Sequence, residues 1–518
     1  MKYNKIISSI IIVIVLSGCG NFEEYNTNPH RTSEVSSSLL ATRLILNVAR
    51  QNTGYSKTYL AHCTYSKLLL WTEGQSREGQ YNEWQRTDVF ENQNMTNLVN
   101  ADKMIEAAPD EGLKNAYMGV RNFIRVYKFL DLTLRVGDIP YSEAMKGESE
   151  NNFFPKYDTQ KEVFLGLLDE LDEADRLLQN ATNNFAGDPV YKGNVAKWRK
   201  LVNSYQLNVL IHLHLKADDP DVRLKQRFQE LLSRPLFESN ADNFQLLYSD
   251  KTNQRYPYYK DGNNYMAYSM MSSVLVDSLK AFKDYRLFYY ANPMTAAINA
   301  DGLSESDFEA YAGVDPTIDF ETVMELYRAS VSNRRYSMMA SRYSEYAPGE
   351  PIYIFSYADV KFILAEACVK GFITGNAQQY YEEGVRAAMT FTGSNTPDAY
   401  TRGRKITPEY IAQYLTNPGV KFESTPQRQL EQIGTQRYIS MFLQAPWEGV
   451  WQLRRINIPN IPVNPATNLN TGDKTKLPVR WMYPNREYIN NTEKVNEAVQ
   501  RQFGGNDSAD GVMWILKK

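Results

Sequence analysis

The chain has 518 residues, which is enough for one large domain or two of ordinary size. Its formal net charge of −3 argues against nucleic acid as the main partner, because binding to phosphates needs clustered Lys and Arg. The 3 cysteines are too few and too far apart for a disulfide framework. Aromatic residues make up 13% of the chain, and the 36 tyrosines provide many rings with an apolar face and a polar tip.

The N-terminus has the pattern of a lipoprotein signal. Lys2 and Lys5 precede an apolar run from Ile6 to Leu16, which is shorter than the ~20 residues of a membrane span. The run ends in Leu16-Ser17-Gly18-Cys19, which resembles a bacterial lipobox. We expect a signal peptide over residues 1–18 and a Cys19 that carries acyl chains such as palmitate and holds the chain on a membrane. The alternative is an ordinary signal peptide in which Cys19 has no role.

A polar segment follows the lipobox. Residues 19–38 are rich in Asn, Thr and Ser and are predicted to be a lipidated tether, whose Ser36–Ser38 can cap the first helix. Helical spacing begins at Leu39, and a second helix is expected from Tyr55 to Trp71. Residues 72–94 lack aliphatic periodicity and are predicted to be a loop, and a loop of this length is usually functional or disordered.

Helical periodicity returns at residue 95, is clearest over residues 160–179, is lost over 240–268 and 291–350, and resumes over 353–390. The predicted fold class is mainly α, with about four tetratricopeptide-like helix pairs that form a curved scaffold and a loop-rich, irregular part packed on it. Helices are also expected near 429–443 and 492–503. Paired in chain order, the hairpins cover 39–71, 95–136, 160–216 and 353–390. We expect one domain over 39–518, with its scaffold at about 39–290 and 352–391 and its loop-rich part at about 291–351 and 392–518.

Catalytic motifs are absent from the sequence, which contains no HExxH, GxSxG, P-loop or GxGxxG pattern. His212 and His214 lie two apart on a predicted helix and point to different sides, so they cannot hold one metal there. Four acidic residues between Glu73 and Asp88 would allow a glycosidase pair, but such residues are too common to identify one. We therefore expect no enzymatic activity, no catalytic residue, no metal and no cofactor.

Aromatic side chains beside polar ones fit ligand binding better. A sugar ring has an apolar C–H face and a rim of hydroxyls, and flat rings next to amide, acidic or Arg side chains suit both. The alternative is that these rings fill the concave side of the scaffold, and similar groups would also hold a peptide. The predicted ligand contacts are Trp71, Arg77, Tyr81, Asn82 and Trp84 in the first stretch, and Tyr256, Tyr258 and Tyr259 in the second.

Several short motifs follow one another along nearly the whole chain. Their residues are Cys19 with Glu23-Glu24, Asn26-Thr27-Asn28-Pro29, Gly187-Asp188-Pro189-Val190-Tyr191 with Gly193-Asn194, Lys197-Trp198 and Asn203-Ser204, Tyr357-Ala358-Asp359-Val360 with Ala365-Glu366-Ala367 and Gly371, Glu448-Gly449, Arg454-Arg455, and Pro478, Arg480, Tyr483-Pro484, Glu487 and Asn490. In this order they resemble the SusD/RagB outer-membrane lipoproteins of Bacteroidetes, in particular the second SusD-like branch.

The resemblance implies a SusD-like fold and a non-catalytic, lipid-anchored protein in the outer membrane that faces the cell exterior. It implies capture of an oligo- or polysaccharide for polysaccharide utilisation and delivery to a SusC-like TonB-dependent transporter, which the protein covers as a lid. No binding residue carries over by motif, although the position of 72–94 after the first helix pair is analogous to a ligand loop of the family. The alternatives are a peptide-binding surface lipoprotein of the RagB type and, less favoured, a glycoside hydrolase lipoprotein.

Overall fold

The computed structural model describes residues 35–50, 58–72, 76–86, 90, 95–260, 268–445 and 447–518. The expected signal peptide, Cys19 and most of the expected tether therefore lie outside the described residues. Within the described part, no helix is long and apolar enough to cross a membrane. The protein is mainly helical and has two short two-stranded sheets in its described part, which confirms the predicted fold class.

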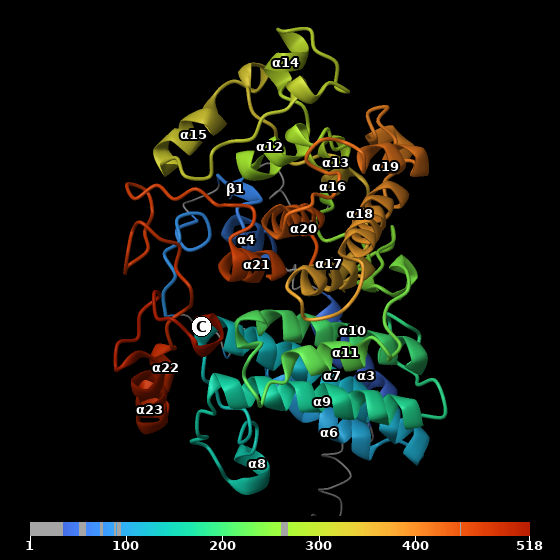
Figure 1. The fold of residues 1–518 in the computed structure, drawn as a ribbon, viewed down its shortest axis with the longest axis vertical. Helices are drawn as coiled ribbons and strands as arrows, with labels where there is room; N and C mark the ends of the chain where they lie inside the picture. Colours follow the sequence, from blue (N-terminus) through green and yellow to red (C-terminus); the bar gives the residue numbers. More distant parts are fainter. Residues whose placement is uncertain are drawn as a thin grey trace, which may run out of the picture.

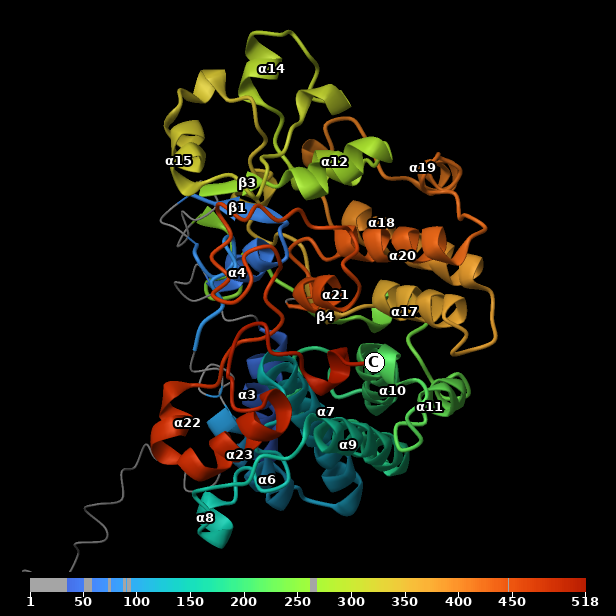
Figure 2. The same ribbon diagram turned by 60° about the vertical axis from the view of Figure 1, so that its left-hand side comes forward.

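Long helices form the lower half of the molecule in Figures 1 and 2. Four of them have an N-cap residue whose side chain accepts a hydrogen bond from the backbone N–H three residues later. These N-cap residues are Ser36, Asp110, Thr159 and Asn194. The elements are α3 (Ser37–Ala49), η1 (Met95–Leu98), α6 (Val99–Glu106), α7 (Glu111–Val136), α8 (Gly147–Glu150), α9 (Gln160–Asn180), α10 (Val195–His212), η2 (His214–Lys216) and α11 (Leu224–Leu231).

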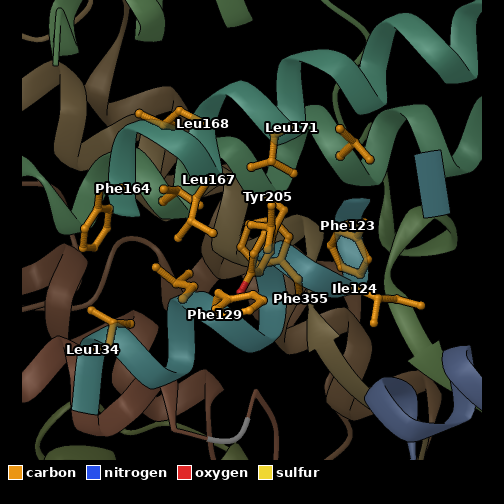
Figure 3. Packing of buried hydrophobic residues seen from close by; sticks show 14 of the residues in the cluster. Phe123, Ile124, Phe129, Leu134, Phe164, Leu167, Leu168, Leu171, Tyr205 and Phe355 are labelled. Atoms are coloured by element: carbon orange, nitrogen blue, oxygen red, sulfur yellow. The ribbon is translucent and has the colours of Figure 1, made fainter. Parts of the chain in front are cut away.

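The apolar faces of α7, α9 and α10 meet in one core, shown in Figure 3. Leu167 and Leu171 of α9 are fully buried there together with Phe123 of α7. The ring of Tyr205 from α10 packs edge-on against Phe123, with 5.4 Å between the ring centroids. The helical spacing over 160–179 therefore predicted both the helix and its buried face.

The upper half consists of shorter elements joined by longer connections, and the C-terminal helices return to the lower half (Figures 1 and 2). The elements are α4 (Thr58–Tyr65), η3 (Asn240–Asp242), α12 (Ser273–Ala281), α13 (Arg286–Tyr290), α14 (Thr295–Asn299), η6 (Phe308–Ala310), α15 (Phe320–Arg328), η7 (Val331–Asn333), α16 (Arg342–Glu345), α17 (Tyr357–Val369), α18 (Ala377–Ser394), η8 (Asp398–Tyr400), α19 (Pro408–Tyr414), α20 (Pro426–Ser440), α21 (Glu448–Ile456), α22 (Asn485–Asn490), α23 (Thr492–Phe503) and η9 (Trp514–Leu516).

Both sheets are antiparallel and join distant parts of the chain. Strand β1 (Leu69–Trp71) pairs with β3 (Ser269–Met271), and β2 (Phe244–Leu246) pairs with β4 (Ile352–Phe355). The helix expected over 55–71 is therefore wrong at its end, because Lys67 adopts a left-handed φ of 58° and the apolar residues after it form β1. Short apolar runs do not distinguish strand from helix by periodicity.

Helix packing follows chain order only in part. α17 packs against α18, and α9 packs against α10, as expected for 353–390 and 160–216. α3, however, packs against α6, while α4 lies against β1 and α21. The long α7 contacts α9 most extensively, so the lower half is a continuous layer of neighbouring helices rather than a set of separate hairpins.

Candidate ligand-binding site

Distant segments meet at one edge of the upper half, where β1 and β3 lie beside α15 (Figures 1 and 2). The backbone N–H of Thr72 donates to the carbonyl oxygen of Tyr268 over 3.1 Å, which extends the sheet. The loop after β1 is held by its Tyr81, whose hydroxyl donates to the carbonyl of Ile318 over 3.2 Å. The carbonyl of Tyr81 accepts from the N–H of Leu469 over 2.7 Å. This edge is thus assembled from four parts of the chain.

A buried lysine fixes the loop after β1. The Nζ of Lys67 donates to the carbonyl oxygens of Gly79 and Gln80 over 2.6 and 2.8 Å, and to Oδ1 of Asn82 over 2.8 Å. Burial lowers the pKa of Lys67 to about 7, while the three acceptor oxygens favour its ammonium form. The amide of Asn82 also donates to Oδ1 of Asn468 over 3.2 Å, so Asn82 connects the loop to the C-terminal segment.

Most of the side chains predicted to contact a ligand are inside the protein. Trp71, Tyr81, Asn82, Trp84, Tyr256 and Tyr258 are buried, whereas Arg77 is exposed and Tyr259 is half-buried. The Nε of Arg77 donates to Glu83 over 2.5 Å, and the guanidinium of Arg255 lies 5.2 Å from the ring centroid of Tyr259. Ligand contact by these eight residues stays a prediction, and for the buried six it would require the surrounding segments to move.

Trp84 anchors its loop to the helical layer. Its ring stacks on Trp481, with 4.0 Å between centroids and an interplanar angle of 11°. Tyr65 packs edge-on against Trp84, and the guanidinium of Arg135 from α7 lies 5.1 Å from the ring centroid of Trp481. Arg86, two residues later, donates to the carbonyl of Tyr483 over 3.0 Å. Trp84 is therefore an interior side chain that anchors its loop to the helical layer.

The second predicted stretch forms part of the upper core. The ring of Tyr256 packs edge-on against Tyr248 and Tyr258, with centroid distances of 5.6 and 5.4 Å. Gly349 also lies against this ring: a Cβ there would approach Tyr256 to 2.1 Å, and φ of Gly349 is 54°. Only glycine suits both conditions. Tyr256 and Tyr258 thus fill the interior in this structure, as in the alternative interpretation of the sequence.

An aromatic row remains accessible at the same edge. The ring of Tyr268 lies 5.9 Å from that of Trp71 and 5.7 Å from that of Tyr327, measured between centroids. The guanidinium of Arg334 lies 5.6 Å from the Tyr327 centroid. Tyr268, Tyr327 and Arg334 are all half-buried. Sequence reasoning missed Tyr327 and Arg334, since they lie in a stretch without periodicity and meet Trp71 only through the fold.

The chemistry of this edge favours binding. Aromatic rings tilted against one another beside a guanidinium suit the C–H faces and hydroxyls of a sugar. Among the acidic residues considered for hydrolysis, Glu78 accepts a hydrogen bond from Tyr65 over 2.6 Å. The Arg77 guanidinium lowers the pKa of Glu83, the opposite of what a general acid needs. Glu73 and Asp88 lie outside the described residues, and no group of three His, Cys, Asp or Glu that would hold a metal occurs in the described part.

Comparison with known proteins gives a consistent result. Residues 29–484 match the model of a SusD-like family described as "Starch-binding associating with outer membrane". A SusD homolog from Bacteroides fragilis NCTC 9343 is 40% identical, with 93% of this chain and 100% of that chain covered and a TM-score of 0.87. A Bacteroides vulgatus ATCC 8482 protein, described as a candidate outer membrane protein for nutrient binding, is 34% identical, with 93% and 100% covered and a TM-score of 0.82.

A chitin-binding protein has the same fold at 23% identity, with 93% of this chain and 99% of that chain covered and a TM-score of 0.72. No curated protein matches the chain. Together, the family match over most of the chain and these two structures, each above 30% identity, show that this chain belongs to the SusD-like family of nutrient-binding proteins associated with the outer membrane.

Proposed function

We propose that this protein captures a glycan at the cell surface, without catalysis, and delivers it to a SusC-like TonB-dependent transporter in the outer membrane. The observation that carries the proposal is the row in which the half-buried rings of Tyr268 and Tyr327 continue the buried Trp71, with Arg334 beside it. The two half-buried rings offer contact to consecutive sugar units, while the guanidinium supplies donors for hydroxyls. The family match to starch-binding proteins supports the same ligand class.

The proposed attachment to the membrane is the lipid on Cys19. The lipobox pattern supports it, as does the outer-membrane association of the family. Residues 19–38 would then connect the anchor to a single domain over 39–518 and give it freedom to move relative to the transporter. An anchor with more than one acyl chain is stable, because each buried CH₂ contributes ~0.8 kcal/mol to membrane binding.

The test is calorimetric titration of the protein without its signal and anchor, residues 20–518, against a panel of glycans and a pool of peptides. We expect heat from at least one glycan and an affinity reduced about fivefold by Tyr327→Ala, since a ring contact contributes ~1 kcal/mol. Tyr380→Ala is the matched control, because Tyr380 is a half-buried tyrosine on α18, which Figures 1 and 2 show on the opposite side of the upper half.

Three results would replace the proposal. Heat with peptides and none with glycans would assign a peptide ligand. Release of products from a glycan, abolished by a single change at Glu78 or Glu83, would assign hydrolysis. An affinity that Tyr327→Ala and Tyr380→Ala leave equally unchanged would move the glycan site away from the aromatic row.

A further inference from the structure

Arg334 differs from the other arginines that the fold covers. It is half-buried, its Nε is buried, and none of its side-chain nitrogens donates to an acceptor among the described residues. Every other buried or half-buried arginine in the described part of the chain donates to a carboxylate or a carbonyl oxygen. A guanidinium that has lost water without gaining an acceptor is unfavourable, so an anionic ligand would stabilise this position.

The next residue along the chain has the counter-ion that Arg334 lacks. The two Nη atoms of Arg335 donate to the carboxylate of Asp301 over 2.7 and 3.2 Å. Arg335 is exposed, whereas Arg334 is half-buried. The carboxylate thus neutralises the more exposed cation of the two. The cation that is more shielded from water, and that would gain more from a counter-ion, remains available to a ligand.

The backbone holds Arg334 in place beside the aromatic row. Its carbonyl oxygen accepts from the N–H of Ala296 over 3.1 Å. Two residues later, the hydroxyl of Tyr336 donates to the carbonyl of Leu326 on α15 over 3.0 Å. These bonds tie the segment to α14 and to α15, which Figures 1 and 2 show next to β1 and β3. A side chain on a fixed backbone loses less conformational entropy when a ligand binds.

The acidic residues of α15 do not neutralise this position. With ~3.6 residues per turn, the exposed Glu321 and Glu325 lie on other sides of the helix than Tyr327. The carboxylate of Asp319 caps the helix, since it accepts from the N–H and the hydroxyl of Thr322 over 2.9 and 2.7 Å. An anion beside Tyr327 would therefore meet the guanidinium of Arg334 and not the carboxylates of the same helix.

We infer that the captured glycan is acidic, and that Arg334 binds its carboxylate or sulfate group while Tyr268 and Tyr327 contact its sugar rings. The inference rests on the proposed function and adds to it the class of sugar. The donors of a guanidinium match two oxygens of such a group, and a charged hydrogen bond is stronger than one to a neutral hydroxyl. The carboxylate of a hexuronic acid is bonded directly to the sugar ring, so a ring that contacts Tyr327 brings it to the guanidinium, 5.6 Å from the Tyr327 centroid.

The test is calorimetric titration of residues 20–518 with matched oligosaccharides that differ in charge alone. The carboxylate pairs are oligogalacturonate and oligoalginate, each with its methyl ester. The sulfate pair is an oligosaccharide of a sulfated galactan with its desulfated form. We expect the charged member of one pair to bind about tenfold more tightly than its neutral partner. A preference within a carboxylate pair would identify a uronic acid, and a preference within the sulfate pair would identify a sulfate ester.

Variants at two adjacent positions then separate a specific contact from general charge. Arg334→Gln should weaken the charged glycan about tenfold and leave its neutral partner unchanged. Arg335→Gln is the matched control, because it removes the same charge from an arginine that already has Asp301, and it should change neither affinity more than about twofold. Arg334→Lys keeps the charge without the planar donors and should give an intermediate loss.

Thermal unfolding of the same variants distinguishes a ligand contact from a structural role. Removing a half-buried charge without a counter-ion does not destabilise the fold, so the Tm of Arg334→Gln should equal or exceed that of the wild type. A Tm well below that of the wild type, together with equal losses for charged and neutral glycans, would assign Arg334 to the fold and overturn the inference.

The titrations have three further outcomes that contradict the inference. If glycans give heat but no charged member binds more tightly than its neutral partner, the glycan is not acidic, while the proposed function stands. If Arg334→Gln and Arg335→Gln weaken the charged glycan equally, the preference comes from general charge and not from Arg334. If no glycan gives heat, the proposed function fails, and the inference fails with it.

Discussion

The helical layer of the lower half and the edge around β1 and β3, the proposed ligand edge, are stabilised in different ways. In the layer, α7, α9 and α10 bury apolar faces against one another, and Leu167, Leu171 and Phe123 are fully buried. At the edge, short strands and loops are joined by hydrogen bonds between distant segments, such as Asn82 with Asn468. The layer therefore depends on apolar area, whereas the edge depends on polar pairs that each have one specific partner.

This difference predicts that the two regions respond differently to substitutions. A lost apolar contact in the layer lowers the stability of the whole domain, because the layer forms one continuous core. A lost polar contact at the edge releases one loop while the layer stays intact, so it affects ligand binding before it affects folding. The following changes test this contrast.

The largest effect is expected where the two halves join. Glu366 of α17 accepts hydrogen bonds from the guanidinium of Arg455 of α21, one of them 2.7 Å long. Burial by itself raises the pKa of Glu366, but the Arg455 charge outweighs it and lowers the pKa to about 2. Glu366→Gln leaves Arg455 buried without its carboxylate and should cost about 4 kcal/mol at pH 7, measured by urea unfolding.

The pH dependence of that effect follows from the direction of the shift. The carboxyl has a pKa near 4.5 when unfolded and about 2 when folded, so its stabilisation is complete above pH 4.5 and is lost as pH falls toward 2. The difference in unfolding free energy between the wild type and Glu366→Gln should therefore shrink between pH 4.5 and 2. A constant difference over this range would show that Glu366 is not ionised in the native state.

A cavity in the layer should have the next largest effect. Leu171→Ala removes a fully buried side chain of α9 and should lower the unfolding free energy by about 3 kcal/mol, measured by urea denaturation. Asp169→Ala, on the exposed side of the same helix, should change it by less than about 1 kcal/mol. Glycan affinity of the folded Leu171→Ala protein should equal that of the wild type. A weakened affinity would contradict the independence of the two regions.

Loss of the buried lysine should affect the edge. Lys67→Met leaves three oxygen acceptors without their donor and should cost about 2 kcal/mol. The loop from 76 to 86 should loosen, so trypsin should cut after Arg77 faster, as measured by mass spectrometry of timed digests. Lys103→Met, at an exposed position on α6, is the matched control. Equal cleavage rates in both variants would show that Lys67 does not hold the loop.

The smallest effect on stability is expected at Arg77. Its side chain is 50% exposed and pairs with Glu83, and exposed ion pairs contribute little to stability. Arg77→Ala should therefore leave the unfolding free energy almost unchanged, while glycan affinity falls about threefold if the predicted contact is real. An unchanged affinity would remove Arg77 from the ligand site.

Local patterns in the sequence predicted most of the scaffold. Ser36 caps α3, helical spacing marks α9, and the C-terminal helix expected at 492–503 is α23 (Thr492–Phe503). These features depend on neighbours within one or two turns, so the sequence contains them directly. The motifs quoted for the family resemblance are likewise local, and the family they indicate is confirmed.

The position of the ligand edge could not be read from local patterns. Trp84 and Tyr256 have the composition expected of a sugar site, yet both are buried, because Trp481 and Gly349 from distant segments cover them. Tyr327 has no distinctive neighbours in sequence, but the fold brings it to Tyr268. Residue type and spacing thus determine which segments become helices. Whether an aromatic ring faces solvent depends on contacts between residues hundreds of positions apart, as between Asn82 and Asn468, and these arise only when the chain folds.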